Sequence, residues 1–126
     1  MINRSVVVEL GGEERTLKFT IQAIEELESL LPYGNVFTLA KKEIWSISEI
    51  VSACYCALRA TDNTVTRKMV QKWVSEYASE NTDGVPQLRL YLFAALGLSG
   101  LIGGEKSAFE SILKILGEKE EAESGK

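Results

Sequence analysis

The stretch Ser5-Val-Val-Val-Glu-Leu-Gly-Gly-Glu-Glu-Arg-Thr-Leu-Lys-Phe19 decides the fold class of this chain. Its two ends, Ser5–Leu10 and Arg15–Phe19, are rich in residues that favour strands, and the two glycines between them suit a tight turn. Leu17 alternates with polar neighbours, so the second run has one apolar face. The stretch therefore predicts a β-hairpin, and a hairpin of two strands must pack on the rest of the chain to be stable.

After the hairpin, the spacing of apolar residues changes from two to near 3.6, which is typical of helices. Thr20 is a suitable N-cap, and Ser46-Ile-Ser-Glu49 has the pattern of a capping box. Pro86 suits the first turn of a helix, and Gly117 suits the C-terminal end of one. We expect about five helices, over residues 20–31, Ser46–Arg59, Thr64–Tyr77, Pro86–Leu98 and Ser107–Leu116, and leave Val36–Lys42 open as a short helix.

The apolar positions of these helices define the predicted core. They begin with Ile21 in the first helix and with Ile47 in the helix that ends at Arg59. The Pro86–Leu98 helix is apolar on nearly all sides, and such a helix lies at the centre of a core or of an interface.

The fold class that we predict is α+β, with an N-terminal β-hairpin packed on a mainly helical body. Residues 1–117 are expected to form a single domain, with the hairpin in residues 1–19 and the helical body in residues 20–117. A chain of 126 residues can bury roughly two-thirds of its unfolded surface without added cross-links. Residues 118–126 are charged and lack large apolar side chains, so we expect a disordered tail there.

Composition excludes several classes of function. The chain has 14 basic and 18 acidic residues, a net charge of −4 that disfavours a general nucleic-acid binder. The absence of histidine excludes Ser-His-Asp and Cys-His nucleophiles and histidine-ligated metals. Cys54 and Cys56 are expected to be buried thiols in a reducing compartment. With no signal-peptide pattern and no apolar run long enough to span a bilayer, we expect a cytoplasmic protein.

The stretch Gly100-Leu-Ile-Gly-Gly-Glu-Lys-Ser107 resembles a phosphate-binding loop only superficially. A P-loop needs glycine directly before its lysine, and it joins a strand to a helix. Here Glu105 precedes Lys106, and the preceding segment is helix-like. We therefore interpret the stretch as a hinge between two apolar helices and expect no nucleotide or other cofactor.

Two other patterns suggest a possible DNA-binding motif and a possible carboxylate site. The Ser46–Arg59 and Thr64–Tyr77 helices could form a helix-turn-helix that meets phosphates through Arg67, Lys68 and Lys72. However, the first helix is long, and Trp73 and Tyr77 look like core anchors.

The three carboxylates Glu25, Glu26 and Glu28 are better explained as a solvated helix face than as an acid–base or metal site. Nothing in the sequence forms a catalytic constellation, so we expect no enzyme and no bound metal.

Binding or assembly remains as the predicted function. Several aromatic residues fall near loops, where they either close the edge of the core or form an exposed patch for a partner. The nearly all-apolar helix is the second candidate surface, toward a partner helix or a second copy of the chain. The candidate interface residues are Tyr33, Phe37, Trp45, Leu88, Tyr91 and Leu92.

One resemblance to a known family adds to these observations. Residues Arg4–Phe19 give a strand, a Gly-Gly turn and the sequence Thr-Leu-Lys-Phe, which leads into a helix carrying Ala23-Ile-Glu-Glu-Leu-Glu28. A helix capped by Ser-x-x-Glu follows and ends in Ala57-Leu-Arg-Ala60. This order resembles the small tail assembly chaperones of long-tailed phages, prophages and gene transfer agents. The resemblance covers residues 4–60 well, and the rest of the chain only in its length and helicity.

The resemblance implies a non-enzymatic chaperone that binds the tape-measure protein and recruits tail tube protein. It supplies no binding residues. A structural tail component, as a tail tube or minor tail protein, is the alternative within this group. A small helix-turn-helix DNA-binding regulator is the alternative from another class. A homo-oligomer is compatible with each of these functions.

Overall fold

The computed structural model describes residues 5–124, with side chains described as far as residue 117. Strands β1 (Ser5–Leu10) and β2 (Glu13–Lys18) form an antiparallel pair in which Val6 lies opposite Leu17. Val6, Val8 and Leu17 are buried, whereas Val7, which lies opposite Thr16, is exposed, so the hairpin has one core face. The predicted hairpin and the α+β class are confirmed.

Strand β2 begins at Glu13, two residues earlier than predicted, because the turn needs only Gly11 and Gly12. Their φ angles are 64° and 80°, and a two-residue hairpin turn of the favoured kind requires positive φ at both positions. The turn packs against the Trp73 ring, and the Arg15 guanidinium lies 3.7 Å from the centre of that ring. The tip of the hairpin is thereby attached to the helical body.

Six helices follow in the described residues, one more than the approximate number expected. They are α1 (Ile21–Leu30), α2 (Val36–Lys41), α3 (Ile47–Arg59), α4 (Arg67–Glu80), α5 (Gly84–Leu98) and α6 (Lys106–Ser124). The ambiguous segment is helix α2, because Asn35 accepts hydrogen bonds from the N–H groups of Phe37 and Thr38. The capping box of Ser46 and Glu49 is present at the start of α3, as predicted.

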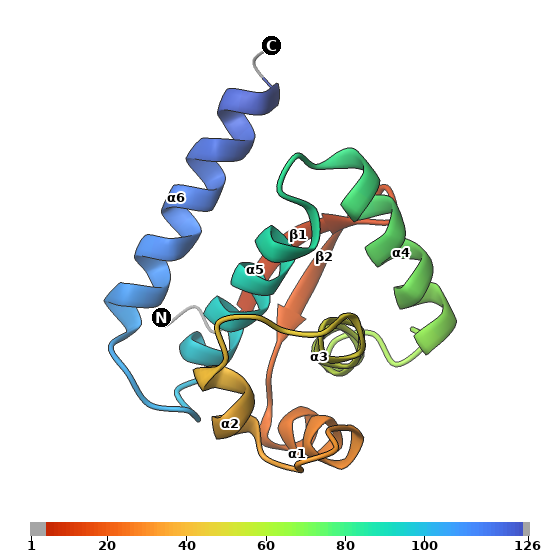
Figure 1. Cartoon of the computed structure of the whole chain (residues 1–126), viewed down its shortest axis with the longest axis vertical. Helices are drawn as coiled ribbons and strands as arrows, with labels where there is room; N and C mark the ends of the chain where they lie inside the picture. The colour runs from red at the N-terminus through yellow and green to blue at the C-terminus, as the bar shows by residue number, and fades with distance from the viewer. Residues whose placement is uncertain (1–4, 125–126) are drawn as a thin grey trace.

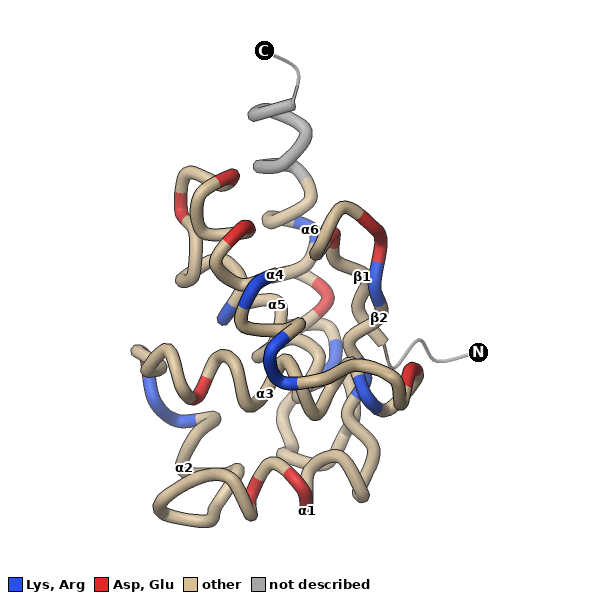
Figure 2. The backbone as a smooth tube through the Cα atoms, turned by 90° about the vertical axis from the view of Figure 1, so that its right-hand side faces the viewer, with Lys and Arg blue, Asp and Glu red and all other residues tan. Residues whose placement is uncertain are grey.

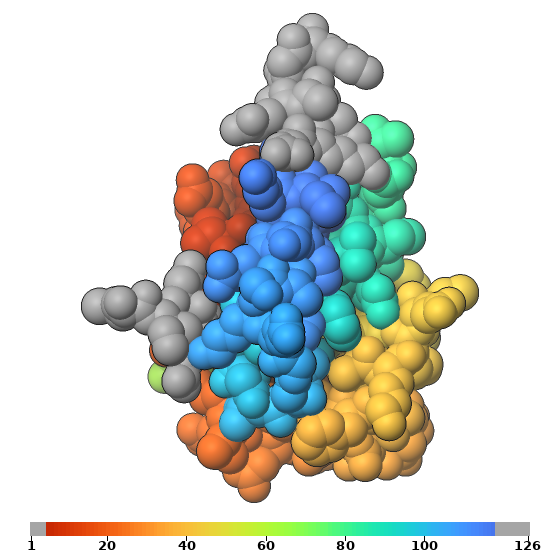
Figure 3. Space-filling model, turned by 90° about the vertical axis from the view of Figure 1, so that its left-hand side faces the viewer, coloured from red at the N-terminus to blue at the C-terminus, as the bar shows by residue number. Residues whose placement is uncertain are grey.

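Helix α5 occupies the centre of the molecule (Figure 1). It contacts the hairpin, α3, α4 and α6, and its side chains are buried over most of its length. Helix α6 lies over α5 on the surface (Figure 3). A single cluster of buried apolar side chains draws members from both strands and all six helices of the described residues. The central position of α5 follows from its apolar character on nearly all sides.

Two features of the helices differ from the prediction. Ile21 is 65% exposed and Ile47 is 60% exposed, and each is the first residue of its helix. Helix α6 continues through Gly117 to Ser124, so Gly117 is not a stop and residues 118–124 have a helical backbone. Glu, Lys and Ala are good helix formers, and one interior glycine costs only about 1 kcal/mol. Residues 125–126 of the predicted tail lie outside the described part of the chain.

Within residues 5–124, no helix combines the length and the apolar character needed to cross a bilayer.

Candidate functional site

Four of the six predicted interface residues lie inside the fold. Trp45, Leu88, Tyr91 and Leu92 are between 0% and 6% exposed. Their prediction as a partner surface is wrong, because they are buried in the core, where the chain's own hairpin and helices α3, α4 and α6 pack against the three that lie on α5. Trp45 also satisfies its indole N–H within the chain, by donating to the Leu39 carbonyl at 3.0 Å.

Tyr33 and Phe37 are exposed, at 38% and 51%, so they stay candidates for contact with a partner. The Tyr33 hydroxyl, however, already donates a hydrogen bond to the Glu49 carboxylate. The Nζ of Lys42 donates to both oxygens of the same carboxylate, at 2.9 and 2.7 Å. Tyr33 therefore helps to join the loop after α1 to the start of α3.

Glu49 supplies the carboxylate at the centre of this cluster. Burial by itself raises the pKa of Glu49, but hydrogen bonds from Lys42, Tyr33 and the Ser46 N–H together outweigh it and lower the pKa to about 2. Burial and the bond to Glu49 raise the pKa of Tyr33. A carboxylate that stays ionised and a phenol that stays protonated at neutral pH are poor acid–base catalysts. The role of the cluster is therefore structural: it joins Tyr33 and Lys42 to Glu49 on α3.

The two cysteines are buried, as predicted. Burial raises the pKa of both the Cys54 and the Cys56 thiol to about 12. Because the thiolate is the reactive species, neither side chain is suited to nucleophilic chemistry at neutral pH.

The glycine-rich stretch at residues 99–105 connects two helices, α5 and α6, as predicted for a hinge. Gly100, Gly103 and Gly104 have positive φ angles of 79°, 79° and 94°. No strand leads into this loop, so the geometry of a P-loop is absent from residues 99–106.

The helix-turn-helix interpretation also fits the geometry poorly. Residues 60–66 connect α3 to α4, whereas the motif uses a turn of about three or four residues. Trp73 and Tyr77 are buried core residues, as predicted.

Two of the three predicted carboxylates of α1 form structural interactions. Glu26 pairs with Arg59 at 3.0 Å, and Glu28 accepts a hydrogen bond from the Val36 N–H at 2.9 Å. Among the described residues, no group of cysteine and carboxylate side chains could hold a metal ion.

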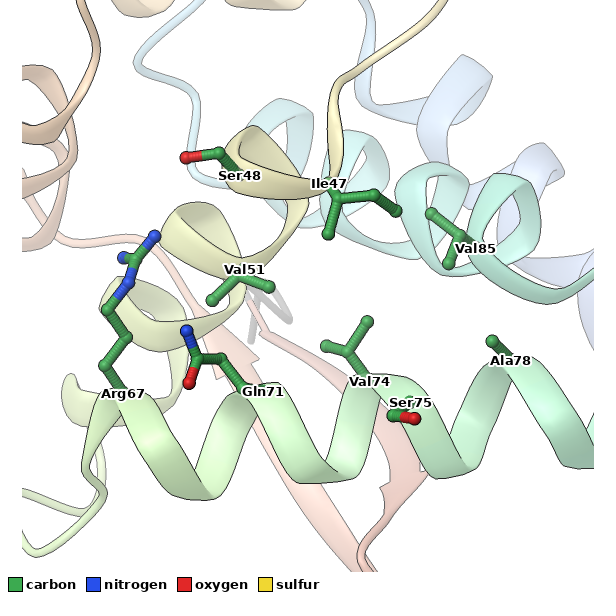
Figure 4. A pocket seen from close by; sticks show the side chains of 9 residues that line it. All are labelled: Ile47, Ser48, Val51, Arg67, Gln71, Val74, Ser75, Ala78 and Val85. Carbon is green, nitrogen blue, oxygen red and sulfur yellow. The ribbon is translucent and has the colours of Figure 1, made fainter.

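An open groove between α3, α4 and the start of α5 is the strongest candidate site (Figure 4). Its volume is about 500 Å³, which lies within the range of ligand pockets. In Figure 4, Ser48, Arg67 and Gln71 lie toward one end of the groove, and Ala78 and Val85 lie toward the other. The apolar residues are Ile47, Val51, Val74, Ala78 and Val85, and the polar residues are Ser48, Arg67, Gln71 and Ser75.

Helix α4 forms the long wall of this groove. Arg67, Gln71, Val74 and Ala78 follow one another at intervals of three or four residues, so they share one face of the helix. From Arg67 to Ala78 this face extends about 17 Å, or three turns. Arg67 lies at one end, where its Nη1 donates to the Ser52 hydroxyl at 3.0 Å.

Sequence reasoning missed this groove. Gln71, Ser75 and Ala78 are small or polar and carry no signal of their own, and Ile47 was assigned to the core. The local signal is limited to two small residues three positions apart on α4, Ser75 and Ala78, and many solvent-facing helices have such a pair.

The chemistry of the groove suits binding better than catalysis. Its two serines have no histidine to activate them, because the chain contains none. A groove about three helical turns long, with apolar and polar side chains in its lining, fits an amphipathic helix that has both kinds of side chain. Comparisons with models of protein families, with curated proteins and with solved structures found no match.

Proposed function

We propose that this chain is a non-enzymatic assembly chaperone of phage or prophage tails that binds helical segments of the tape-measure protein. The observation that carries the proposal is the groove between α3 and α4, an open groove of helical length whose lining combines apolar and polar side chains. The resemblance of residues 4–60 to tail assembly chaperones, including those of gene transfer agents, supplies the identity of the partner. Tail tube protein is the second proposed partner, and the host cytoplasm is the proposed location.

The groove suggests how a client helix is held. Apolar client residues at i, i+3, i+4 and i+7 would contact Ile47, Ala78 and Val85, and burial of each such client side chain contributes about 1–3 kcal/mol. The guanidinium of Arg67, at the end of the groove, is placed to meet a client carboxylate. A chaperone acting in this way would keep apolar client helices from associating with one another before the tube forms.

Client binding can be tested with matched variants. Fluorescence anisotropy would follow the binding of labelled helical peptides taken from the tape-measure protein encoded near this gene. Ile47→Glu places a charge in the groove and should weaken binding about tenfold or more, because a client apolar group would then face an unpaired carboxylate. Ile115→Glu is the control, because Ile115 is similarly exposed, at 64%, but lies on α6 outside the groove.

Equal binding by the two variants would contradict the groove as the client-binding site. No binding by wild type would contradict the proposed chaperone function. Assembly in vitro separates a chaperone from a structural tail component, because only a component stays in the finished tube. A gel shift that weakens with added salt would favour the DNA-binding regulator.

A further inference from the structure

The outward side of α4 carries a ridge of four charged residues at intervals of four. Lys68, Lys72, Glu76 and Glu80 follow each other along the helix, and all four are at least partly exposed. We call these four residues the charge ridge. In Figure 2, basic positions occupy the lower part of α4 and acidic positions the upper part. None of the salt bridges formed among the residues with described side chains uses the ridge.

This charge order is unfavourable for α4 by itself. A helix favours acidic residues near its N-terminus and basic residues near its C-terminus, and α4 has the reverse. Lys68 and Lys72 repel each other at i and i+4, and so do Glu76 and Glu80. The pair of Lys72 and Glu76 has the lysine first, which is the weaker order for an ion pair on a helix. The isolated chain therefore gains little from the ridge.

The same order is self-complementary when two copies of α4 run antiparallel. Consider a two-fold axis that crosses the ridge at the level of residue 74 along α4. It places Lys68 opposite Glu80 of the other copy and Lys72 opposite Glu76. Both pairs arise at one register, because the residue numbers in each pair are centred on 74. Rows of residues at i and i+4 on two helices align when the helices cross at about 50°, which keeps both pairs in register.

We propose that the charge ridge of α4 is the interface of an antiparallel homodimer. The occupant of this face is a second copy of the chain, since a parallel arrangement would oppose lysine to lysine. Ser79, beside the ridge, has a short side chain that allows the two helices to approach closely. The interface is small and polar, so the dimer is a weak one that depends on charge. This inference goes beyond the proposed function and does not rest on it.

Charge exchange tests the pairing directly. The variant Lys68→Glu/Lys72→Glu has an all-acidic ridge, and Glu76→Lys/Glu80→Lys has an all-basic one. Sedimentation of each variant alone should show monomers with the 13.9 kDa mass of one chain. Their equimolar mixture should form a heterodimer, because every ridge contact then joins opposite charges. Wild type should form a dimer that weakens about tenfold or more between roughly 0.1 M and 1 M salt, where charges are screened within about 3 Å.

The control variant Lys41→Glu/Lys114→Glu makes the same change in net charge at two exposed lysines on α2 and α6, and should dimerise like wild type. Melting followed by circular dichroism would verify that each variant is folded. A monomeric wild type would overturn the inference. So would a mixture of the two ridge variants that stays monomeric. Loss of tape-measure binding by Ile47→Glu would leave the dimer unaffected, so failures of the two proposals can be told apart.

Discussion

Gly97, the last residue but one of α5, lies directly beneath the ring of Phe109 on α6. A Cβ atom added at Gly97 would overlap three carbon atoms of that ring. The ring cannot easily move away, because it also makes an edge-to-face contact with Phe93 at a centroid distance of 5.4 Å. Gly97→Ala is therefore a small change that should separate α6 from α5.

Two opposing effects determine how much Gly97→Ala changes the free energy of unfolding. Alanine favours a helix over glycine by about 1 kcal/mol, which stabilises the variant. Overpacking costs about 1–3 kcal/mol, and displacement of a buried aromatic ring brings the cost toward the 3–5 kcal/mol of a Phe→Ala change. We expect a net loss of about 1–3 kcal/mol in the free energy of unfolding, measured by urea denaturation.

Gly117→Ala is the matched control, because a Cβ there meets no atom within 4 Å. It should stabilise the protein by up to about 1 kcal/mol if α6 continues through residue 117. In a Phe109→Ala background the cost of Gly97→Ala should vanish, which a double-mutant cycle would show as coupling. Equal stability of Gly97→Ala and Gly117→Ala would refute the close fit of the two helices.

Two further predictions concern the Glu49 cluster and the hairpin turn. The folded-state pKa of Glu49, about 2, lies below its ordinary value of 4.5, so its stabilising contribution is complete above pH 4.5 and is lost as pH falls toward 2. Glu49→Gln should lower the free energy of unfolding by about 2–3 kcal/mol at pH 7, and urea titrations should show that the gap closes near pH 2; a gap independent of pH would contradict this. Gly11→Ala should lower the melting temperature more than Gly12→Ala, because both residues have positive φ but only a Cβ at Gly11 would overlap Trp73. Equal losses in the two variants would mean that the turn does not depend on its contact with Trp73.

Local chemistry in the sequence was sufficient to predict most elements. The Gly-Gly turn with alternating neighbours determined the hairpin, and the reciprocal hydrogen bonds of Ser46 and Glu49 determined the start of α3. These signals act between residues at most a few positions apart, so they can be read without knowing the fold. The apolar character of Pro86–Leu98 similarly indicated a central helix.

Tertiary structure decided which surfaces stay open. Leu88 and Leu92 were equally compatible with a core and with an interface, and only the packing of distant elements around α5 showed that they are core. Ile47 has an apolar side chain in a predicted core position, yet it borders an open groove because nothing covers the first turn of α3 on that side. Periodicity specifies the direction of a side chain from its own helix axis. What lies in that direction depends on segments tens of residues away, and therefore the groove becomes visible only in the folded chain.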